Sequence, residues 1–513
     1  MTCSIRVSLA ALAVALATTA PTQALAQSAS AQSAPAQSST PAAAPTAAED
    51  LAAMRAQLEA MTKRINALEA QLAARQAAAA EPQLAQQSAG LPIVATAPTM
   101  AAAAAPAPTP APAPVPAATP ASGASPTKLA KKDGSSLTIR GYAQVRYNHI
   151  LSGDVDAPAG RSRLRSVQDS GIGSDTNFSF RRIRLVFQGD LGNGISYYLQ
   201  PDFAVAVNNQ SSGERRENFA QLRDAYVDIA LDKNREFKLR LGQSKVPFGW
   251  ENLQSSSNRI PLDRTDGINS AVPGERDIGL VAYYTPASVQ AIWDDLSKDG
   301  QKLFGNYGAF GLGVFNGQGT NRPERNDGLM TVAMGTWPVR LDGLGPMFKD
   351  QVFEFGGALM HNTIRPEVRS GGVSEVGFKE RRVGLHAVLY PKPFGIQAEW
   401  AWGKGPQFDT ATQSIDLKGL SGGYVMAMYR VNDFLPGSFI PFARWERYRG
   451  GWKAAVNAPR LETQDFEVGF EWAPVKPIEL TLSYARMQRR EADERRTGRA
   501  EGNVVRAQVQ WNY

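Results

Sequence analysis

Strict alternation of apolar and polar residues over long segments is the feature that most constrains the fold of this chain. In SLTIRGYAQVRYNHIL, residues 136–151, the odd positions from Leu137 to Tyr147 are apolar, aromatic or glycine, whereas the even positions from Ser136 to Arg146 are polar or carry a polar tip. Side chains of a β-strand point alternately to its two faces, so this pattern predicts a strand with one apolar and one polar face. The period of two returns in about sixteen segments, among them FKLRLGQS, RRVGLHAVLY, FGIQAEWAW, DFEVGFEW, IELTLSYA and NVVRAQVQWNY.

The number and length of these segments favour a membrane barrel over a soluble β-sandwich. Many exceed the typical soluble strand, and turns alternate with longer Gly-rich loops, as in outer-membrane barrels. After residue 26 the chain has no run of about 18 apolar residues, and a closed barrel is the only other architecture that spans a bilayer. The sequence therefore predicts an all-β, 16-stranded antiparallel transmembrane β-barrel over residues 135–513. Aromatic residues that fit its interfacial girdles are Trp337, Trp400, Trp402, Trp445 and Trp472.

The first residues have the pattern of a secretory signal peptide. Arg6 supplies a positive charge, Val7 to Ala17 form a short apolar core, and Ala24-Leu25-Ala26 is a small-x-small cleavage site. We therefore expect residues 1–26 to be removed on export. The single cysteine, Cys3, lies in this segment, so the mature chain would have no disulfide, no thiolate nucleophile and no all-cysteine metal site.

Three segments of different composition separate the signal from the barrel. Residues 27–47 are rich in Gln, Ser, Ala and Pro and predict a flexible leader, and residues 80–134 are mostly Ala and Pro and predict an extended linker. Residues 48–79 carry an apolar seam with 3-4 spacing, which predicts a short coiled coil. The seam consists of Leu51, Met54, Leu58, Met61, Ile65, Leu68 and Leu72.

The chain ends on an aromatic residue at the end of an alternating strand. Val505, Ala507, Val509, Trp511 and Tyr513 share one face. This pattern resembles the assembly signal at the C-terminus of bacterial outer-membrane barrels.

Arginines are concentrated at the start of RRIRLVFQGD, residues 181–190. If Ile183, Leu185 and Phe187 face lipid, then Arg182 and Arg184 face the water-filled lumen, where a charge avoids the cost of about 2–4 kcal/mol at the lipid midplane. Arg181 breaks the alternation, so we expect the regular strand to begin at Arg182. Nucleic-acid binding is the rival interpretation, but no basic helix or aromatic platform accompanies the cluster.

Several segments in succession resemble the phosphate-selective porin O and P family of trimeric outer-membrane barrels. They are FSFRRIRLVFQGDLGNGISYYLQPDF (178–203), LRDAYVDIAL (222–231), LRLGQSKVPFGWENLQSS (239–256), ERDIGLVAYY (275–284) and GAFGLGVFNGQG (308–319). The resemblance implies sixteen strands per pore, a third extracellular loop that folds inward, here within 245–277, and a basic path for small anions such as phosphate. By this resemblance and by strand alternation, the expected pore-lining or anion-binding residues are Arg140, Arg146, Arg181, Arg182, Arg184, Lys238, Arg240, Lys245, Arg259, Arg264 and Arg276.

Charge counts make the expected lumen mixed rather than purely basic. The net charge is +7 for the chain and +5 for residues 135–513, a mild excess. The inward loop also carries acidic residues, and so do inward strand positions. The sequence therefore leaves open whether the channel passes phosphate or other solutes. These acidic residues are Asp263, Asp266, Glu275, Asp277, Asp224, Asp228, Glu399, Glu467 and Glu471.

Two other functions are alternatives to a porin. An enzyme is disfavoured because the three histidines, His149, His361 and His386, are far apart in sequence and no hydrolase, zinc-protease or Walker motif occurs. A cell-wall anchor, in which the coiled coil binds peptidoglycan, would not need an arginine-lined interior but is compatible with transport. We expect no cofactor, no bound metal and no nucleic acid; the expected partners are small inorganic anions, outer-membrane lipid, lipopolysaccharide and two further copies of the chain in a homotrimer.

Overall fold

The computed structural model describes residues 59, 63, 127–131, 134–153, 164, 169, 171–172, 178–205, 219–305, 307–326, 328–431, 434–496 and 498–513. The predicted signal peptide and leader lie outside these residues. Of the predicted coiled coil only Glu59 and Lys63 are described, and both are helical and exposed. Only the last few residues of the predicted linker are described.

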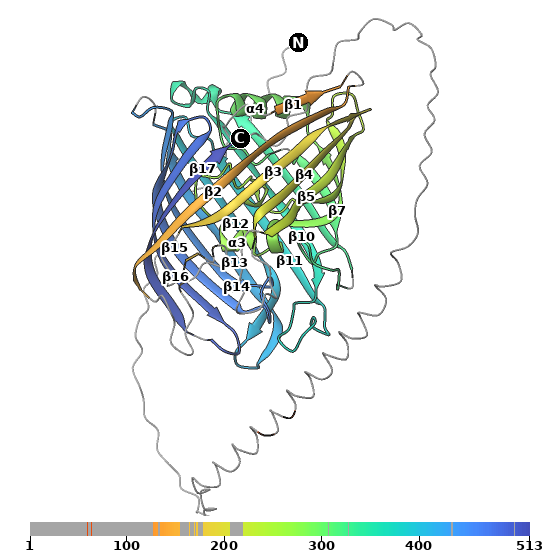
Figure 1. Ribbon diagram of the computed structural model, residues 1–513, viewed down its shortest axis with the longest axis vertical. Coiled ribbons are helices and arrows are strands. Elements are labelled where there is room, and N and C mark those ends of the chain that lie inside the picture. The colour runs from red at the N-terminus through yellow and green to blue at the C-terminus, as the bar shows by residue number, and fades with distance from the viewer. Residues whose placement is uncertain are drawn as a thin grey trace, which may run out of the picture. The chain divides into compact units, whose positions relative to one another are not determined.

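Sixteen antiparallel strands close into a barrel, as the sequence predicts (Figure 1). Each strand from β2 to β16 pairs with the next one along the chain, and β17 pairs back with β2, so these sixteen strands form a closed ring. The strands are β2 (Ser136–Gly153), β3 (Phe178–Gly192), β4 (Ile195–Val205), β5 (Phe219–Ala230), β6 (Phe237–Lys245), β7 (Arg276–Tyr284), β8 (Phe310–Phe315), β9 (Met330–Arg340), β10 (Val352–Ile364), β11 (Phe378–Leu389), β12 (Phe394–Asp409), β13 (Ser414–Tyr429), β14 (Ser438–Gly451), β15 (Arg460–Val475), β16 (Ile478–Ala492) and β17 (Arg499–Asn512).

A seventeenth strand, β1 (Thr127–Ala130), pairs with residues 136–139 of β2. It continues the edge of β2 beyond Tyr142, where the pairing of β17 ends. The sequence had placed these residues in the linker 80–134, because four residues are too few to show a period. The backbone groups of β2 that extend past β17 explain the difference, since they need partners and β1 supplies them.

The connections are unequal at the two ends of the barrel. At one end the hairpins are mostly short, such as residues 193–194 and 476–477, and this end is called the short-turn end. At the other, long-loop end, the connections include residues 246–275 and 365–377. Two short 3-10 helices, η3 (Asp342–Leu344) and η4 (Pro346–Phe348), lie in the connection from β9 to β10. No helix in the described ranges is long and apolar enough to cross a membrane.

The two faces of the wall differ as the alternation predicts. Large apolar side chains such as Leu359, Leu385 and Trp402 are exposed on the outside. Arg182 and Arg184 are buried on the inside, opposite Gln144 and Tyr142 of β2.

The expected start of the arginine-rich strand is wrong by four residues. β3 begins at Phe178, and the register slips by one residue where Gln144 pairs with Arg182 but Val145 pairs with Phe180. Arg181 is the extra residue of this β-bulge, which explains why it breaks the alternation without ending the strand. Its guanidinium reaches inward, with Nη2 3.5 Å from Asp263 Oδ1.

The C-terminal residue closes the seam between β17 and β2. The Tyr513 amide donates to the Gly141 carbonyl at 2.9 Å, and the Gly141 amide donates to the Tyr513 carbonyl at 2.6 Å. A Cβ at Gly141 would lie 2.4 Å from the Arg184 carbonyl oxygen and 2.5 Å from the Tyr513 ring. The absence of a side chain at Gly141 therefore lets the terminal ring lie directly against the backbone of the wall.

We predict that Gly141→Ala destabilises the barrel by about 1–3 kcal/mol, because the added methyl collides with a backbone carbonyl that cannot move away. Urea unfolding in detergent micelles measures the effect. Gly419→Ala is the matched control, since a Cβ there meets nothing within 4 Å. Equal stability of the two variants would contradict the role assigned to Gly141.

Candidate functional site

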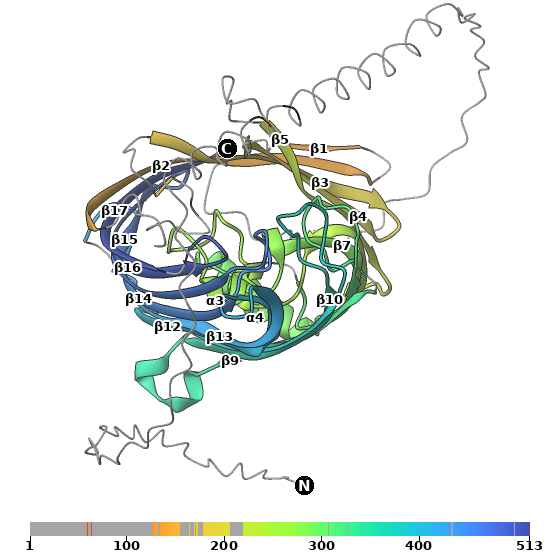
Figure 2. The same ribbon diagram turned by 90° about the horizontal axis from the view of Figure 1, so that it is seen from below.

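The connection from β6 to β7, residues 246–275, folds into the barrel. In Figure 2 its helix α3 (Asp266–Asn269) lies inside the ring of strands. The loop also contains α2 (Trp250–Leu253) and the 3-10 helix η2 (Pro273–Glu275). Its described side chains are buried except at Ser255, which is half-buried, and Gly274, which is exposed. The expected inward loop is found within the predicted range 245–277, although Lys245 at one end and Arg276 and Asp277 at the other belong to β6 and β7.

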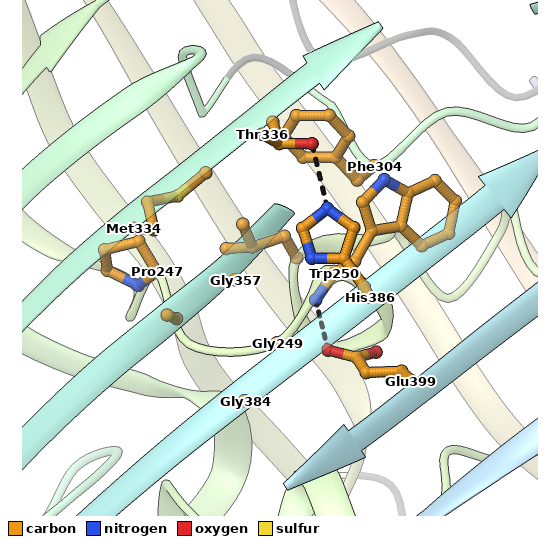
Figure 3. Close-up of a pocket in the computed structure, with 12 residues that line it drawn as sticks. Pro247, Gly249, Trp250, Phe304, Met334, Thr336, Gly357, Gly384, His386 and Glu399 are labelled. Atoms are coloured by element: carbon orange, nitrogen blue, oxygen red, sulfur yellow. Dashed lines mark hydrogen bonds between the residues drawn. The ribbon is translucent and has the colours of Figure 1, made fainter. Parts of the chain in front are cut away.

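A wall carboxylate holds the first turn of α2. Glu399 of β12 accepts the amide of Trp250 at Oε1 (2.7 Å) and the amide of Glu251 at Oε2 (3.0 Å). Figure 3 shows the contact with the Trp250 amide beside the hydrogen bond of 2.8 Å between Thr336 Oγ1 and His386 Nε2. The first amides of a helix have no partner within it, so a carboxylate there satisfies them. Glu399 therefore anchors the loop, which is a role that the strand alternation did not indicate.

Two arginines on the opposite wall hold the middle of the loop. Arg146 of β2 and Arg506 of β17 both contact Asp263, with Arg146 Nη1 at 3.0 Å from Oδ2. The same two guanidinium groups lie 2.7 and 2.8 Å from Asp169. Burial raises the pKa of Asp169, but the Arg146 and Arg506 charges outweigh it, so the pKa lies well below the usual range. Arg489 of β16 fixes α3 through Asp266 at 2.8 Å.

A second segment enters the barrel from the short-turn end. Residues 285–309 contain α4 (Ala287–Lys298), followed by a stretch in which Lys302 pairs with Glu471 at 2.7 Å and Glu479 at 3.0 Å. This segment meets the inward loop, because Gln254 Nε2 donates to the Lys302 carbonyl at 3.0 Å and Asn258 Nδ2 to the Leu303 carbonyl at 2.7 Å.

The two segments share a buried carboxylate on β10. Glu354 accepts the indole N–H groups of Trp250 (3.0 Å) and Trp293 (2.9 Å), one from each segment. The sequence reading missed α4, although ASVQAIWDDLSK carries a detectable signal. Val289, Ile292, Trp293 and Leu296 have the i, i+3, i+4, i+7 spacing of an amphipathic helix, directly after Pro286.

Most of the predicted pore-lining cations are neutralised by carboxylates. Arg184 Nε lies 2.7 Å from Asp202, and Arg276 Nη2 lies 2.9 Å from Asp224. Arg264 pairs with Glu275 inside the loop. On β6 both Lys238 and Arg240 contact Asp228, at 3.6 and 2.7 Å. Most of the acidic residues expected on the inward loop and on inward strand positions are therefore partners of the basic residues, as close charges in a narrow space require.

Three of the predicted cations have no carboxylate within 4 Å among the described residues, and we call them the carboxylate-free cations: Arg182, Lys245 and Arg259. All three are buried. Lys245 donates to the carbonyls of Leu253 (3.1 Å) and Gln254 (2.7 Å), so it stands where the loop meets the wall, as expected.

The other two have guanidinium N–H groups to spare. Arg182 donates through Nη1 to Gln144 at 2.8 Å, and Arg259 donates through Nη2 to the Leu262 carbonyl at 3.2 Å. Within the described structure, Arg182 Nε and Arg259 Nε and Nη1 are buried and have no hydrogen-bond partner. Burial, followed by the nearby Arg264 charge, lowers the pKa of Arg259 to about 9.

The remaining two predicted residues lie at the edges of this region. Arg140 Nη2 donates to Gln188 at 3.1 Å, and Arg181 keeps its long contact to Asp263. In the part of the chain that the structure describes, no group of three or more His, Cys, Asp or Glu residues could hold a metal ion.

A closed barrel of sixteen strands with a loop folded into its interior is the architecture of an outer-membrane porin, a channel for small solutes. Residues 160–513 match the family model described as "Phosphate-selective porin O and P". The match covers more than half of the sequence, so the chain belongs to this family, as its motifs predict. Comparison with curated proteins gives no match.

Several solved porin structures are similar to this chain at low sequence identity. The outer membrane channel DcaP of Acinetobacter baumannii is 14% identical, with a TM-score of 0.47 over 75% of this chain and 99% of that one. An anion-selective porin from Comamonas acidovorans is also 14% identical, with a TM-score of 0.41 over 74% and 100%. OmpF of Salmonella typhi is 12% identical, with a TM-score of 0.46 over 75% and 100%. These TM-scores are below 0.5, so the assignment rests on the family match and the barrel.

We predict that Glu399→Gln loosens the first turn of α2. The glutamine side chain keeps one oxygen acceptor but places its NH₂ group opposite one of the two backbone N–H groups. That buried N–H then has no acceptor, which costs about 1–3 kcal/mol. Hydrogen exchange followed by mass spectrometry should show faster exchange at Trp250 and Glu251. Glu375→Gln, in the exposed part of the loop 365–377, is the control. Unchanged protection in Glu399→Gln would show that other contacts hold the loop.

Proposed function

We propose that this porin conducts small anions by passive diffusion, and that phosphate or a similar oxyanion is its solute. The observation that carries the proposal is the carboxylate-free cations beside the inward loop. Arg182 and Arg259 are buried cations that form no direct ion pair with a carboxylate of the described residues, and they have N–H groups to spare. Guanidinium groups bind oxyanions of this shape by charge-assisted hydrogen bonds.

The neutralised pairs sharpen this proposal. Because Arg184, Arg240 and Arg276 pair with carboxylates, they contribute little to the net electrostatic field. The selectivity for anions therefore depends mainly on the carboxylate-free cations. This differs from an evenly basic pore, in which every predicted arginine would contribute.

Arg182→Gln and Arg259→Gln should each lower the anion-to-cation permeability ratio about fivefold, the equivalent of ~1 kcal/mol of Coulomb energy lost at close range in water. The reversal potential of the purified protein in a planar bilayer, under a chloride gradient and then a phosphate gradient, measures this. Arg340→Gln is the control, since Arg340 is exposed at the short-turn end and paired with Asp295 at 2.5 Å. Lys245 is a poorer test, because its removal also releases the loop carbonyls.

A wild-type protein that prefers cations would contradict the proposal, and so would unchanged reversal potentials in both glutamine variants. If chloride and phosphate gave the same ratio and phosphate did not reduce chloride current, anion selectivity would stand and phosphate preference would not.

The N-terminal segments and the assembly state belong to the same proposal. We propose that residues 1–26 are cleaved, that residues 48–79 form a periplasmic coiled coil at the end of the 80–134 linker, and that three barrels associate through their walls. The heptad seam supports the coiled coil, and family membership supports the trimer. Peptidoglycan binding by the coiled coil is compatible with this arrangement and adds to the transport function.

Deletion of residues 27–126 should leave a trimer of folded barrels, because all sixteen barrel strands and β1 lie beyond this segment. Native mass spectrometry in mild detergent measures the assembly, with the full chain as control. A monomeric product would show that the N-terminal segment drives assembly, and a loss of folding would contradict the independence of the barrel.

A further inference from the structure

A row of basic side chains crosses the outer surface of the barrel at the long-loop end. His361 of β10 pairs directly with Arg381 of β11, and Arg381 pairs directly with Lys404 of β12. Lys379 lies two residues before Arg381 on the same face. Arg381, Lys379 and Lys404 are exposed. We call His361, Lys379, Arg381 and Lys404 the basic row.

In the part of the chain that the structure describes, the basic row has no ion pair with a carboxylate. Among the described residues, no carboxylate lies within 4 Å of Lys379, Arg381 or Lys404, in contrast to the arginines of the lumen. Like charges directly opposite each other destabilise a pair of strands, and Arg381 faces Lys404 in this way. The row therefore has an electrostatic cost that an external anion would remove.

An apolar row lies beside the basic row, one step towards the short-turn end. It consists of residues paired one to the next across five strands: Leu312, Ala333, Leu359, Val383 and Trp402. The small side chain of Ala333 lies between Leu312 and Leu359, which are 66% and 56% exposed, so the wall is hollowed there. Both rows line one groove of about 860 Å³ on the outer surface.

The position of the groove assigns it to one leaflet of the membrane. In outer-membrane barrels the short turns face the periplasm and the long loops face outward. Lys379 and Arg381 come directly after the long loop 365–377, so the basic row lies at the outer interface and the apolar row lies in the outer leaflet. A charge on the lipid face costs little at the interface, about 0–1 kcal/mol for Arg or Lys.

We propose that this groove binds a phosphorylated, multiply acylated saccharide lipid of the outer leaflet, with its phosphates on Arg381, Lys404 and Lys379 and its acyl chains along Leu359, Val383 and Trp402. Gly419, the β13 neighbour of Lys404, has no atom within 4 Å of a Cβ position, which leaves room for the sugar beside the lysine. Free phosphate uses the basic row alone and gains nothing from the apolar row. The site lies outside the lumen, so it does not depend on which solute the channel conducts.

Native mass spectrometry of the full chain, titrated with bisphosphorylated lipid A in detergent, tests the proposal. We expect one lipid per barrel, and the double variant Arg381→Gln/Lys404→Gln should weaken binding about tenfold or more, because two charge-assisted contacts are lost. Lipid A without its phosphates should bind the wild-type protein as weakly as the phosphorylated lipid binds the double variant. Heat-modifiable mobility on gels shows that each variant is folded.

Arg447→Gln is the matched control. Arg447 is exposed on the outer face of β14 and pairs across the strands with Gly423 and Gln464, so its loss removes a charge without touching the groove. Its affinity for lipid A should equal that of the wild type. The proposal is overturned if the double variant binds as tightly as the wild type, if Arg447→Gln weakens binding equally, or if dephosphorylated lipid binds as well as the phosphorylated form.

Discussion

The structure depends on one constraint, which is that a sheet in a membrane must leave no backbone group without a partner. Sixteen strands meet this constraint by closing, and the closure is completed at the seam where the Tyr513 and Gly141 backbones exchange hydrogen bonds. Once the sheet is closed, successive side chains of each strand point alternately to the outside and to the inside of the barrel. Half face lipid and must be apolar, and half face a confined interior in which charges lie close together.

That confinement explains the electrostatics of the interior. Charged groups that lie close together away from bulk water need an ion pair, hydrogen bonds or a bound ligand of opposite charge. Asp202, Asp224 and Asp228 pair with wall arginines, and Asp263 joins the loop to Arg146 and Arg506. The carboxylate-free cations differ from this background because most of the other predicted pore-lining cations form a direct ion pair with a carboxylate. The same requirement applies on the outer wall, because the basic row lacks the carboxylate partners that most interior arginines have.

The two segments inside the barrel differ in how far the sequence revealed them. The inward loop was expected from family motifs, and Lys245 was placed correctly at its junction with the wall. The segment 285–309 was missed, although Val289, Ile292, Trp293 and Leu296 carry a helical period. Nothing in that period says that the helix sits at the mouth of a barrel or that the following residues reach the loop through Lys302 and Leu303. Those contacts join segments that are about fifty residues apart and come together only when the barrel has closed.

The sequence by itself determined the all-β class, the approximate number of strands and the face on which strand arginines such as Arg182 and Arg184 lie, because these follow from a local period of two. Only the tertiary structure decided which cations form a direct ion pair with a carboxylate. Pairing between Arg146 and Asp263, or between Glu399 and the amides of α2, depends on where the loop rests against the wall. The bulge at Arg181 and the strand β1 were also decided there, because each depends on the backbone register of a neighbouring strand. Strand alternation determines the face of the wall on which a side chain lies. The ion-pair or hydrogen-bond partner of that side chain depends on distances between segments far apart in sequence, which a local period does not specify.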